Sequence, residues 1–316
     1  MGDILRVIPA WLNLARAFDG ARIQAVVEDR HAYLLEPLQG IEPVIVRRKK
    51  LSNPFLAMAE LSRVGRLVKG ADASLDFHGI LKSALIPYFA KIPTRWGDGR
   101  AKEGAGRLQN AWPPFKARDR YSQALGLAEC FGQRHGVPGL GCFTPALKDA
   151  VLPPSDAWLV HADAKAARIL LVPGTSRAGA NKRWPLKYWL RLARELKGHA
   201  DLRWSLGPDE AAMRGWLPDV SGVEALPAMP FWELASLIRT LDRVIVGDTG
   251  LLHLSVLLGT KVTALMGPSD RAVSNIPDGT GTVLWTDASC APCRERRCLR
   301  RSCMEQLDVS KVLATL

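Results

Sequence analysis

Short apolar runs alternate with amphipathic segments along the C-terminal half of the chain, and this alternation constrains the fold most. Each apolar run ends near a Gly or Pro, as buried strands do, and the segment after it has apolar residues at helical spacing. Strands that alternate with helices pair in parallel and are covered on both faces, which predicts a doubly wound Rossmann-like domain. The predicted strands are 167–174, 202–208, 222–226, 242–247 and 261–267, and the predicted helices are 184–198, 208–217, 230–241 and 251–259.

The N-terminal half has the same rhythm but opens on a loop and a helix, where such a domain should open on a buried strand. We therefore expect an N-terminal sheet without its first strand and, as a consequence, poor stability or no activity. A Pro- and Gly-rich stretch at 132–164 separates the halves and predicts two domains, 1–155 and 156–316. The predicted N-terminal strands are 22–28, 42–46, 73–77 and 92–97, with helices at 3–18, 31–38, 54–69 and 79–91.

The composition is that of a soluble globular protein, with 47% hydrophobic and 23% charged residues in 316. No apolar run is long enough to cross a bilayer, and the N-terminus lacks the basic leader of a signal peptide, so a cytoplasmic protein is expected. The net charge of +12 suits nucleic acid, anionic lipid or a phosphorylated substrate. The basic run 47–50 fits such a partner and an ordinary solvated face equally well.

Four cysteines are clustered near the C-terminus, at Cys290, Cys293, Cys298 and Cys303. In a cytoplasmic protein such a cluster favours a metal over disulfides, and the first pair has good chelate spacing. The other gaps are less diagnostic, and no histidine joins them. A structural zinc site and a set of free thiols both remain open.

Two loops could hold an anion, and each follows a predicted strand. The first, "VPGTSRAGANKRWP", offers glycine, the hydroxyls of Thr175 and Ser176, and the charge of Lys182, although it is not a Walker A loop. The second, "GDTGLLH", places Asp248, Thr249 and Gly250 where a strand ends and a helix begins, with His253 in the first turn.

Together the two loops indicate a nucleotide or diphosphate site, because doubly wound sheets bind ligands at the carboxyl edge of their strands. "DTG" is also an aspartic protease signature. That class of enzyme pairs two such triplets on an all-β scaffold, and neither condition holds here, so we reject it.

Four separated blocks resemble glycosyltransferase family 9, the heptosyltransferases, in family order and over nearly the whole chain. They begin "MGDILRVIPAWLNLARAF", "ASLDFHGILKSALIPYFAK", "ILLVPGTSRAGANKRWP" and "VIVGDTGLLHLSVLLG". The second block resembles the segment typical of the lipopolysaccharide heptosyltransferase I type. The resemblance implies a GT-B fold, in which two Rossmann-like domains with parallel sheets face a cleft. It also implies inverting transfer from ADP-L-glycero-D-manno-heptose to a Kdo–lipid A type acceptor, without a metal in catalysis.

The resemblance assigns roles to single residues. Thr175, Ser176, Lys182, Asp248, Thr249, Gly250 and His253 would bind the donor. Glu210 matches a nucleoside-binding acid, with Asp209 as its rival. Asp3 matches a general base, although an Asp before a helix is often an N-cap.

For the acceptor, the resemblance implies His78, Lys82, Arg100 and Lys102. His78 replaces the family's glutamine, and Lys102 stands where relatives often carry arginine, so the acceptor itself can differ. A glycolipid acceptor places the enzyme at the inner face of the bacterial inner membrane, where the run 47–50, Lys82 and Lys102 would help it dock.

Two other functions fit parts of the sequence. A GT-B transferase or epimerase for a different nucleotide sugar would have the same donor loops. A nucleic-acid or metal-binding protein built on the basic, Cys-rich tail ranks lower, because the tail has no interleaved aromatics and no recognised zinc-finger spacing. The expected partners are therefore an ADP-heptose donor and an anionic glycolipid, and no nucleic acid.

Overall fold

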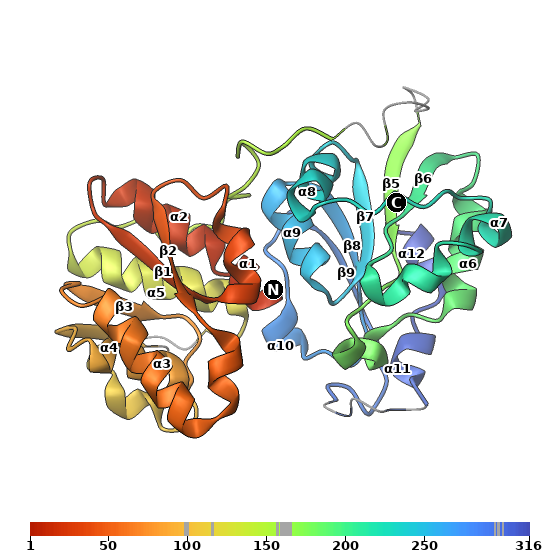
Figure 1. Cartoon of the computed structure of the whole chain (residues 1–316). Helices are drawn as coiled ribbons and strands as arrows, with labels where there is room; N and C mark the ends of the chain where they lie inside the picture. Colours follow the sequence, from red (N-terminus) through yellow and green to blue (C-terminus); the bar gives the residue numbers. More distant parts are fainter. Residues whose placement is uncertain are drawn as a thin grey trace. The chain divides into compact units, whose positions relative to one another are not determined.

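The computed structural model describes residues 1–97, 101–114, 117–155, 158, 166–293, 295, 298 and 300–316. The chain divides into two compact units, Asp3–Ala146 and Leu147–Leu316 (Figure 1). Arg100, one of the predicted acceptor residues, lies outside the described residues. No described helix is long and apolar enough to cross a membrane.

A five-stranded parallel sheet forms the centre of the C-terminal unit, with strand order β6-β5-β7-β8-β9. Successive side chains of a strand point to opposite faces, so both faces of an inner strand can be buried. Val244, Ile245 and Val246 show this pattern, since all three are fully buried. The strands are β5 (Ala167–Val172), β6 (Ala200–Trp204), β7 (Arg243–Gly247), β8 (Lys261–Met266) and β9 (Gly281–Trp285).

Helices cover both faces of this sheet (Figure 1). One face packs against α6 and the C-terminal helices in a cluster that includes Trp189, Trp204 and Met304. α8 and α9 pack against each other, and α9 contacts β7 and β8. The helices are α6 (Leu186–Leu196), α7 (Leu217–Ser221), α8 (Phe231–Arg239), α9 (Gly250–Leu258), α10 (Arg271–Ser274), α11 (Ser302–Glu305) and α12 (Val309–Leu313), with 3₁₀ turns η5 (Arg177–Lys182) and η6 (Pro208–Met213).

Two separate two-stranded parallel sheets form the N-terminal unit, β1 with β2 and β3 with β4. The strands are β1 (Ile23–Glu28), β2 (Ile41–Val46), β3 (Ala73–Asp76) and β4 (Thr94–Gly97). In the part of the chain that the structure describes, no strand joins β1 to β3.

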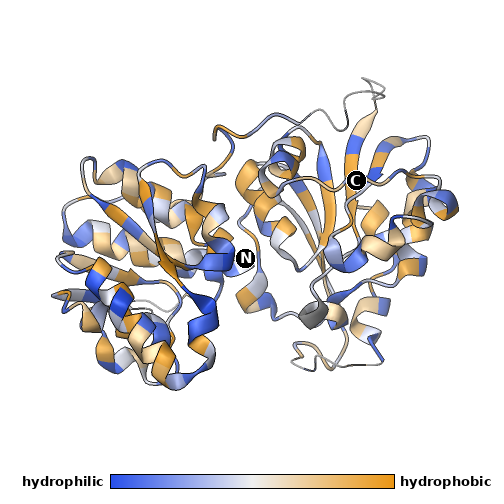
Figure 2. Ribbon diagram, viewed as in Figure 1, coloured by the Kyte–Doolittle hydropathy of each residue, from blue (hydrophilic) through white to orange (hydrophobic). Residues whose placement is uncertain are grey.

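The same helices bridge both small sheets. α3 and α4 share one apolar cluster with β2, while α2 and α5 share another that also contacts Ile23 of β1 and Leu75 of β3. Figure 2 shows apolar residues along the strands and alternating apolar and polar residues along the helices. The elements are α1 (Gly2–Leu5), α2 (Ile8–Ala17), α3 (Pro54–Leu67), α4 (Leu81–Phe89) and α5 (Arg120–Arg134), with 3₁₀ turns η1 (Asp29–Leu35), η2 (Arg48–Ser52) and η3 (Ala105–Leu108).

Four sequence predictions of secondary structure are wrong. The predicted strand 222–226 makes only an isolated bridge, between Ala225 and Trp204. The predicted helices 31–38 and 208–217 are replaced by the 3₁₀ turns η1 and η6, and the predicted helix 3–18 is broken into α1 and α2.

Candidate functional site

The carboxyl ends of β5, β7 and β8 bring together loops that are far apart in the sequence. β5 lies between β6 and β7, so the connections from β5 and β7 leave in different directions at this point of the sheet. Such a switch point opens a crevice beyond the strand ends, which is where doubly wound sheets bind ligands. Both predicted donor loops start here, directly after β5 and β7.

A lysine, an aspartate and a serine from three of these loops form one hydrogen-bonded group. Lys182 Nζ donates to Asp248 Oδ2 at 2.6 Å, and Ser269 Oγ donates to the same oxygen at 2.6 Å. The Asp248 side chain is only 7% exposed. Burial disfavours its charged form, but the Lys182 ammonium, the two hydrogen bonds and nearby His253 together hold the pKa of Asp248 below its ordinary value. Asp248 is therefore a carboxylate that fixes the position of the lysine.

The first turn of α9 presents backbone amides beside this group. Thr249 is the N-cap residue, yet its side chain makes no capping bond, and its buried Oγ1 has no hydrogen-bond partner among the described residues. The first amides of a helix lack intrahelical acceptors, and the helix dipole favours negative charge there. A buried hydroxyl without a partner beside such amides suits an oxygen-rich anion. His253, from the same turn, is almost fully buried.

A second network, centred on Arg183, holds the loop after β5. Arg183 donates to Glu210 Oε1 at 2.9 Å, to the Thr175 carbonyl at 2.8 Å and to Thr175 Oγ1 at 3.1 Å. A Cβ on Gly174 would lie 2.4 Å from Glu210 Oε2, so the glycine lets this carboxylate lie close to the loop backbone. Glu210 thus ties the loop after β6 to the loop after β5.

The structure locates the remaining predicted donor residues as follows. Ser176 is exposed at the start of η5, and Asp209, the rival of Glu210, is exposed where Glu210 is buried. Gly250 is the first residue of α9.

Sequence reasoning did not single out Arg183 or Ser269. Ser269 had a usable signal, since "GPSD" follows a buried strand next to β7. Arg183 had none beyond its position after Lys182.

Asp3 lies inside α1 and not at its N-cap, because the helix begins at Gly2. Its side chain is 77% exposed and forms a 3.4 Å ion pair with Arg6. The capping role is therefore wrong in this structure, and the role of general base stays a prediction.

The predicted acceptor residues cluster around a buried aspartate at the end of β3. Asp76 accepts hydrogen bonds from the amides of His78 and Gly79, and also from Ser83 Oγ and Gln109 Nε2, all at 3.0 Å. The Lys102 amide donates to the Gly79 carbonyl at 2.7 Å. These bonds bring the loop around 102 to the β3–α4 loop, and His78, Lys82 and Lys102 are all exposed there.

The four C-terminal cysteines do not form a metal site in this structure. Among the described residues, no group of three or more His, Cys, Asp or Glu side chains could hold a metal ion. Cys303 is buried and Cys290 is exposed. The pKa of the Cys303 thiol is raised. Burial is the main cause, and the other three cysteines of the cluster add to it. The predicted zinc site finds no support.

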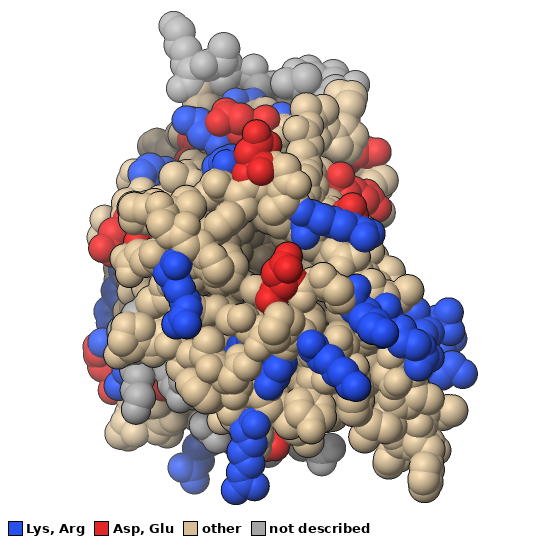
Figure 3. All heavy atoms as spheres, turned by 90° about the vertical axis from the view of Figure 1, so that its left-hand side faces the viewer, with Lys and Arg blue, Asp and Glu red and all other residues tan. Residues whose placement is uncertain are grey.

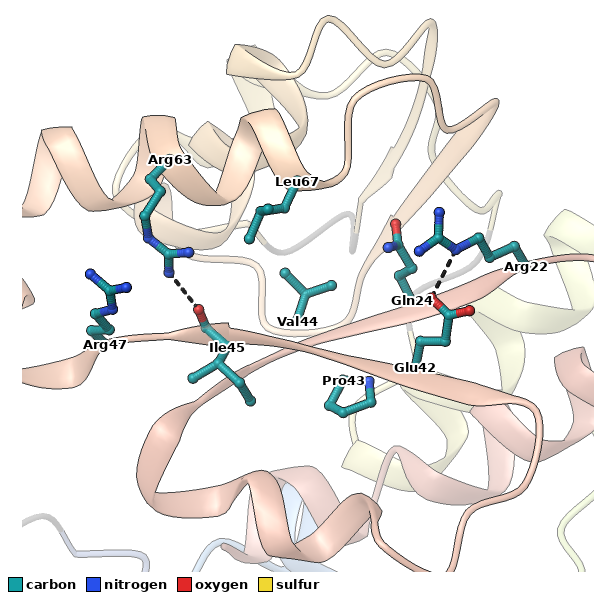
Figure 4. A pocket seen from close by; sticks show the side chains of 9 residues that line it. All are labelled: Arg22, Gln24, Glu42, Pro43, Val44, Ile45, Arg47, Arg63 and Leu67. Carbon is teal, nitrogen blue, oxygen red and sulfur yellow. Dashed lines mark hydrogen bonds and ion pairs between the residues drawn. The ribbon is translucent and has the colours of Figure 1, made fainter.

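Of two cavities among the described residues, one borders the first network. It has a volume of about 280 Å³ and is lined by Ser269 together with Arg271 and Trp285 in the C-terminal unit. The other, of about 380 Å³, lies between α3 and the β1–β2 sheet of the N-terminal unit. Figure 4 shows Arg47 and Arg63 at one end of the second cavity, and the ion pair of Arg22 with Glu42 at the other. Its arginines make this cavity polar at both ends.

A family model for glycosyltransferase family 9 (heptosyltransferase) matches residues 61–303. The chain belongs to this family. It is therefore a glycosyltransferase, and the resemblance seen in the four sequence blocks is confirmed.

The relatives of this family 9 protein agree with that assignment. It is 27% identical over 315 residues to lipopolysaccharide heptosyltransferase 1 of Pseudomonas aeruginosa, covering 94% of this chain and 84% of the relative. It is 25% identical over 303 residues to lipopolysaccharide heptosyltransferase 2 of Salmonella typhimurium, covering 84% of this chain and 83% of the relative.

Solved structures show the fold. Escherichia coli heptosyltransferase WaaC with ADP-2-deoxy-2-fluoro heptose superposes with a TM-score of 0.72 at 20% identity, covering 99% of this chain and 95% of that one. The family 9 structure from Veillonella parvula gives 0.73 at 15% identity, covering 99% and 92%. The predicted GT-B fold with parallel α/β units is confirmed.

Proposed function

We propose that this family 9 protein transfers a heptose from ADP-L-glycero-D-manno-heptose to a Kdo–lipid A type acceptor of the lipopolysaccharide inner core. The observation that carries the donor half is the group of Lys182, Asp248 and Ser269 beside the first turn of α9. The names of its relatives, heptosyltransferases 1 and 2 of lipopolysaccharide, support the rest.

The chemistry required of the donor site is charge stabilisation. As the acceptor hydroxyl attacks the anomeric carbon, the bond to the diphosphate breaks and ADP gains negative charge. Lys182 and the first amides of α9 are fixed in advance, so they can stabilise that charge in the transition state without rearranging. A lysine and helix amides supply this stabilisation without a metal, and inversion needs one attack with a base to take the hydroxyl proton. We assign that base to Asp3.

The acceptor would be an anionic glycolipid at the inner face of the inner membrane, approached from the cytoplasm. The exposed side chains of His78, Lys82 and Lys102 support this proposal, because two of them are cationic and all three surround one loop at the end of β3.

A second candidate is transfer to a different inner-core acceptor, as in the heptosyltransferase 2 class. The match to the Salmonella typhimurium enzyme supports it, at 25% identity against 27% for the Pseudomonas aeruginosa heptosyltransferase 1. The two candidates share the donor and differ only in the acceptor.

Two measurements test the donor site. We expect calorimetry to show that ADP binds and UDP does not, and that Lys182→Ala weakens ADP binding about tenfold or more, as the loss of a charge-assisted hydrogen bond predicts. Lys187→Ala, an exposed lysine on α6, is the matched control and should bind like the wild type. Equal binding of ADP by the Lys182 variant would remove Lys182 from the site.

Transfer from ADP-heptose to Kdo2–lipid A tests the reaction. We expect Asp3→Ala to lose most turnover while its ADP affinity is unchanged, because a base acts on the acceptor and not on the donor. Transfer only to an acceptor that already carries one heptose would select the second candidate. No transfer to either acceptor would refute the proposed function.

A further inference from the structure

The first turn of α3 exposes apolar side chains that the fold does not use. Phe55 is 87% exposed, Met58 is 50% exposed and Leu56 is 45% exposed. The opposite face of α3 is also apolar and packs into the N-terminal core through Leu61 and Val64. The N-terminal part of α3 is therefore apolar on the solvent-facing side as well as on the side that packs into the core. An exposed apolar patch of this kind marks an interaction site.

The segment that leads into α3 is strongly basic. Arg47, Arg48, Lys49 and Lys50 are all exposed, and one of them, Arg48, is paired with Glu28 at 3.5 Å. Between residues 47 and 70 the only acidic residue is Glu60, which is buried. Lys and Arg side chains also gather over the lower part of the face drawn in Figure 3, where acidic side chains are few.

The fold holds the basic and apolar side chains next to each other. Glu60 accepts a hydrogen bond from the Arg47 amide at 2.9 Å and forms a 2.6 Å ion pair with Arg63, so the start of the basic run is tied to the middle of α3. Asn53 caps α3 by accepting from the amides of Phe55 and Leu56 at 3.0 and 3.2 Å. The two groups therefore form one surface.

We propose that this surface, formed by residues 47–50 with Phe55, Leu56 and Met58, docks the enzyme onto an anionic lipid bilayer. The cations contact lipid headgroups while the three apolar side chains enter the boundary between headgroups and acyl chains. This inference rests on the proposed function, which needs access to a membrane-embedded acceptor, and it names the surface that supplies it.

Charge favours a membrane over a protein partner. Among the described residues, acids outside α3 contact this run only at Arg48, through Glu28 and Asp29, and residues 47–58 themselves contain none. Such a predominantly cationic segment complements a diffuse negative surface, whereas a protein interface mixes both signs to fix its register. A short apolar turn flanked by Lys and Arg is the composition of a segment that lies in the membrane interface.

Vesicle co-sedimentation of the purified full chain tests the proposal. We expect the wild type to bind vesicles of equal parts phosphatidylglycerol and phosphatidylcholine, to release at high salt, and not to bind pure phosphatidylcholine. Phe55→Ser with Met58→Ser, and separately Lys49→Glu with Lys50→Glu, should each weaken binding about tenfold or more. Circular dichroism and thermal unfolding establish that each variant is folded.

Matched controls lie in the C-terminal unit. Val220→Ser removes an apolar side chain that is 54% exposed on α7, and Lys187→Glu with Arg194→Glu reverses two exposed charges on α6. Both should bind vesicles like the wild type. Unchanged binding by either patch variant, or equal losses in the controls, would overturn the proposal. A wild-type dimer that Phe55→Ser dissociates would overturn it in favour of a second copy of the chain.

The vesicle assay contains neither donor nor acceptor, so its outcome is independent of transferase activity. A protein that binds the vesicles but fails to transfer heptose would refute the proposed function and leave the docking surface standing. A protein that transfers heptose, but whose vesicle binding does not depend on these side chains, would refute the docking surface and leave the proposed function standing.

Discussion

Asp248 is the residue on which the donor site depends, because one of its oxygens holds two side chains from other loops. Its carboxylate holds the Lys182 ammonium in a fixed position, from which the lysine would contact the proposed diphosphate. Asp248 stays ionised only above its lowered pKa. Its ion pair with Lys182 is therefore lost as the pH falls through that pKa.

The hydroxyl of Ser269 is expected to act as a positioning group for this pair. Ser269→Ala should weaken ADP binding about fivefold to tenfold, because a hydrogen bond to a buried carboxylate is lost. It should also raise the pKa of Asp248, so that ADP binding fails at a higher pH than in the wild type. A pH series of calorimetric titrations measures both effects.

Two variants make this prediction decisive. Ser269→Thr keeps the hydroxyl and should restore both the affinity and the pH profile. Ser310→Ala, at an exposed serine of α12, should change neither. An unchanged pH profile in Ser269→Ala would mean that the hydroxyl does not position the pair.

At the scale of elements, an ion pair within α3 links the helix to β2 through hydrogen bonds to backbone groups. Arg63 donates to the Ile45 carbonyl at 2.7 Å and to Glu60, while Glu60 also accepts from the Arg47 amide. The hydrogen bonds from Arg63 outweigh burial and, with the Arg47 amide, lower the pKa of Glu60 to about 2. The docking of the helix is thus linked to the charge of one carboxylate.

This linkage predicts how stability depends on pH. The folded pKa of Glu60 lies below its ordinary value of 4.5, so its contribution is complete above about pH 5 and is lost as the pH falls toward 2. Glu60→Gln should lower the free energy of unfolding by about 2 kcal/mol at pH 7, and the difference from the wild type should shrink in acid. Urea unfolding at several pH values measures it. Glu42→Gln, which breaks the exposed pair with Arg22, should cost under about 1 kcal/mol; a similar cost for both variants would contradict the argument.

The elements that the sequence predicted well are those whose signal is local. Buried parallel strands are continuous apolar runs, so β5, β7 and β8 were predictable from residues such as Val244–Val246. β9 was missed because it is a half-exposed edge strand, and α5 because Gly126 and Gly132 weaken its helical pattern. Packing against α2 stabilises α5, and a single sequence does not reveal that contact.

The candidate site likewise has one part that the sequence predicts and one part that it does not. Thr175, Lys182, Asp248 and Thr249 follow strand ends, and strand ends can be read from the pattern. The bonds of Arg183 with Glu210 and of Ser269 with Asp248 join loops 27 and 21 residues apart. They depend on the strand order of the sheet, which a single sequence does not specify.

At the scale of the molecule, the two units differ in how completely their sheets are paired. β5, β7 and β8 each have a neighbour on both sides, whereas β1 and β3, within the described ranges, each have one. Backbone groups at an unpaired edge have only water or side chains as partners. The N-terminal unit should therefore be the less stable of the two.

Hydrogen exchange followed by mass spectrometry tests this difference. We expect amides of β1 and β3 to exchange faster than those of β5, β7 and β8, because local opening needs less free energy where fewer backbone bonds must break. ADP should slow exchange in the loops after β5 and β7 and leave β1 unchanged. Equal protection of β1 and β7 would show that the split sheet costs no stability, and the expectation of a poorly stable N-terminal half would then be wrong.

The exposed cysteines offer a practical way to observe this enzyme at work. Cys142 belongs to the N-terminal unit and Cys290 to the C-terminal unit, and these are the two exposed thiols among the six, while Cys303 is buried. With the partly covered thiols replaced by serine, one donor and one acceptor fluorophore could be attached without engineering new sites. Energy transfer between them would then report any ligand-driven change in the distance between the units, one molecule at a time.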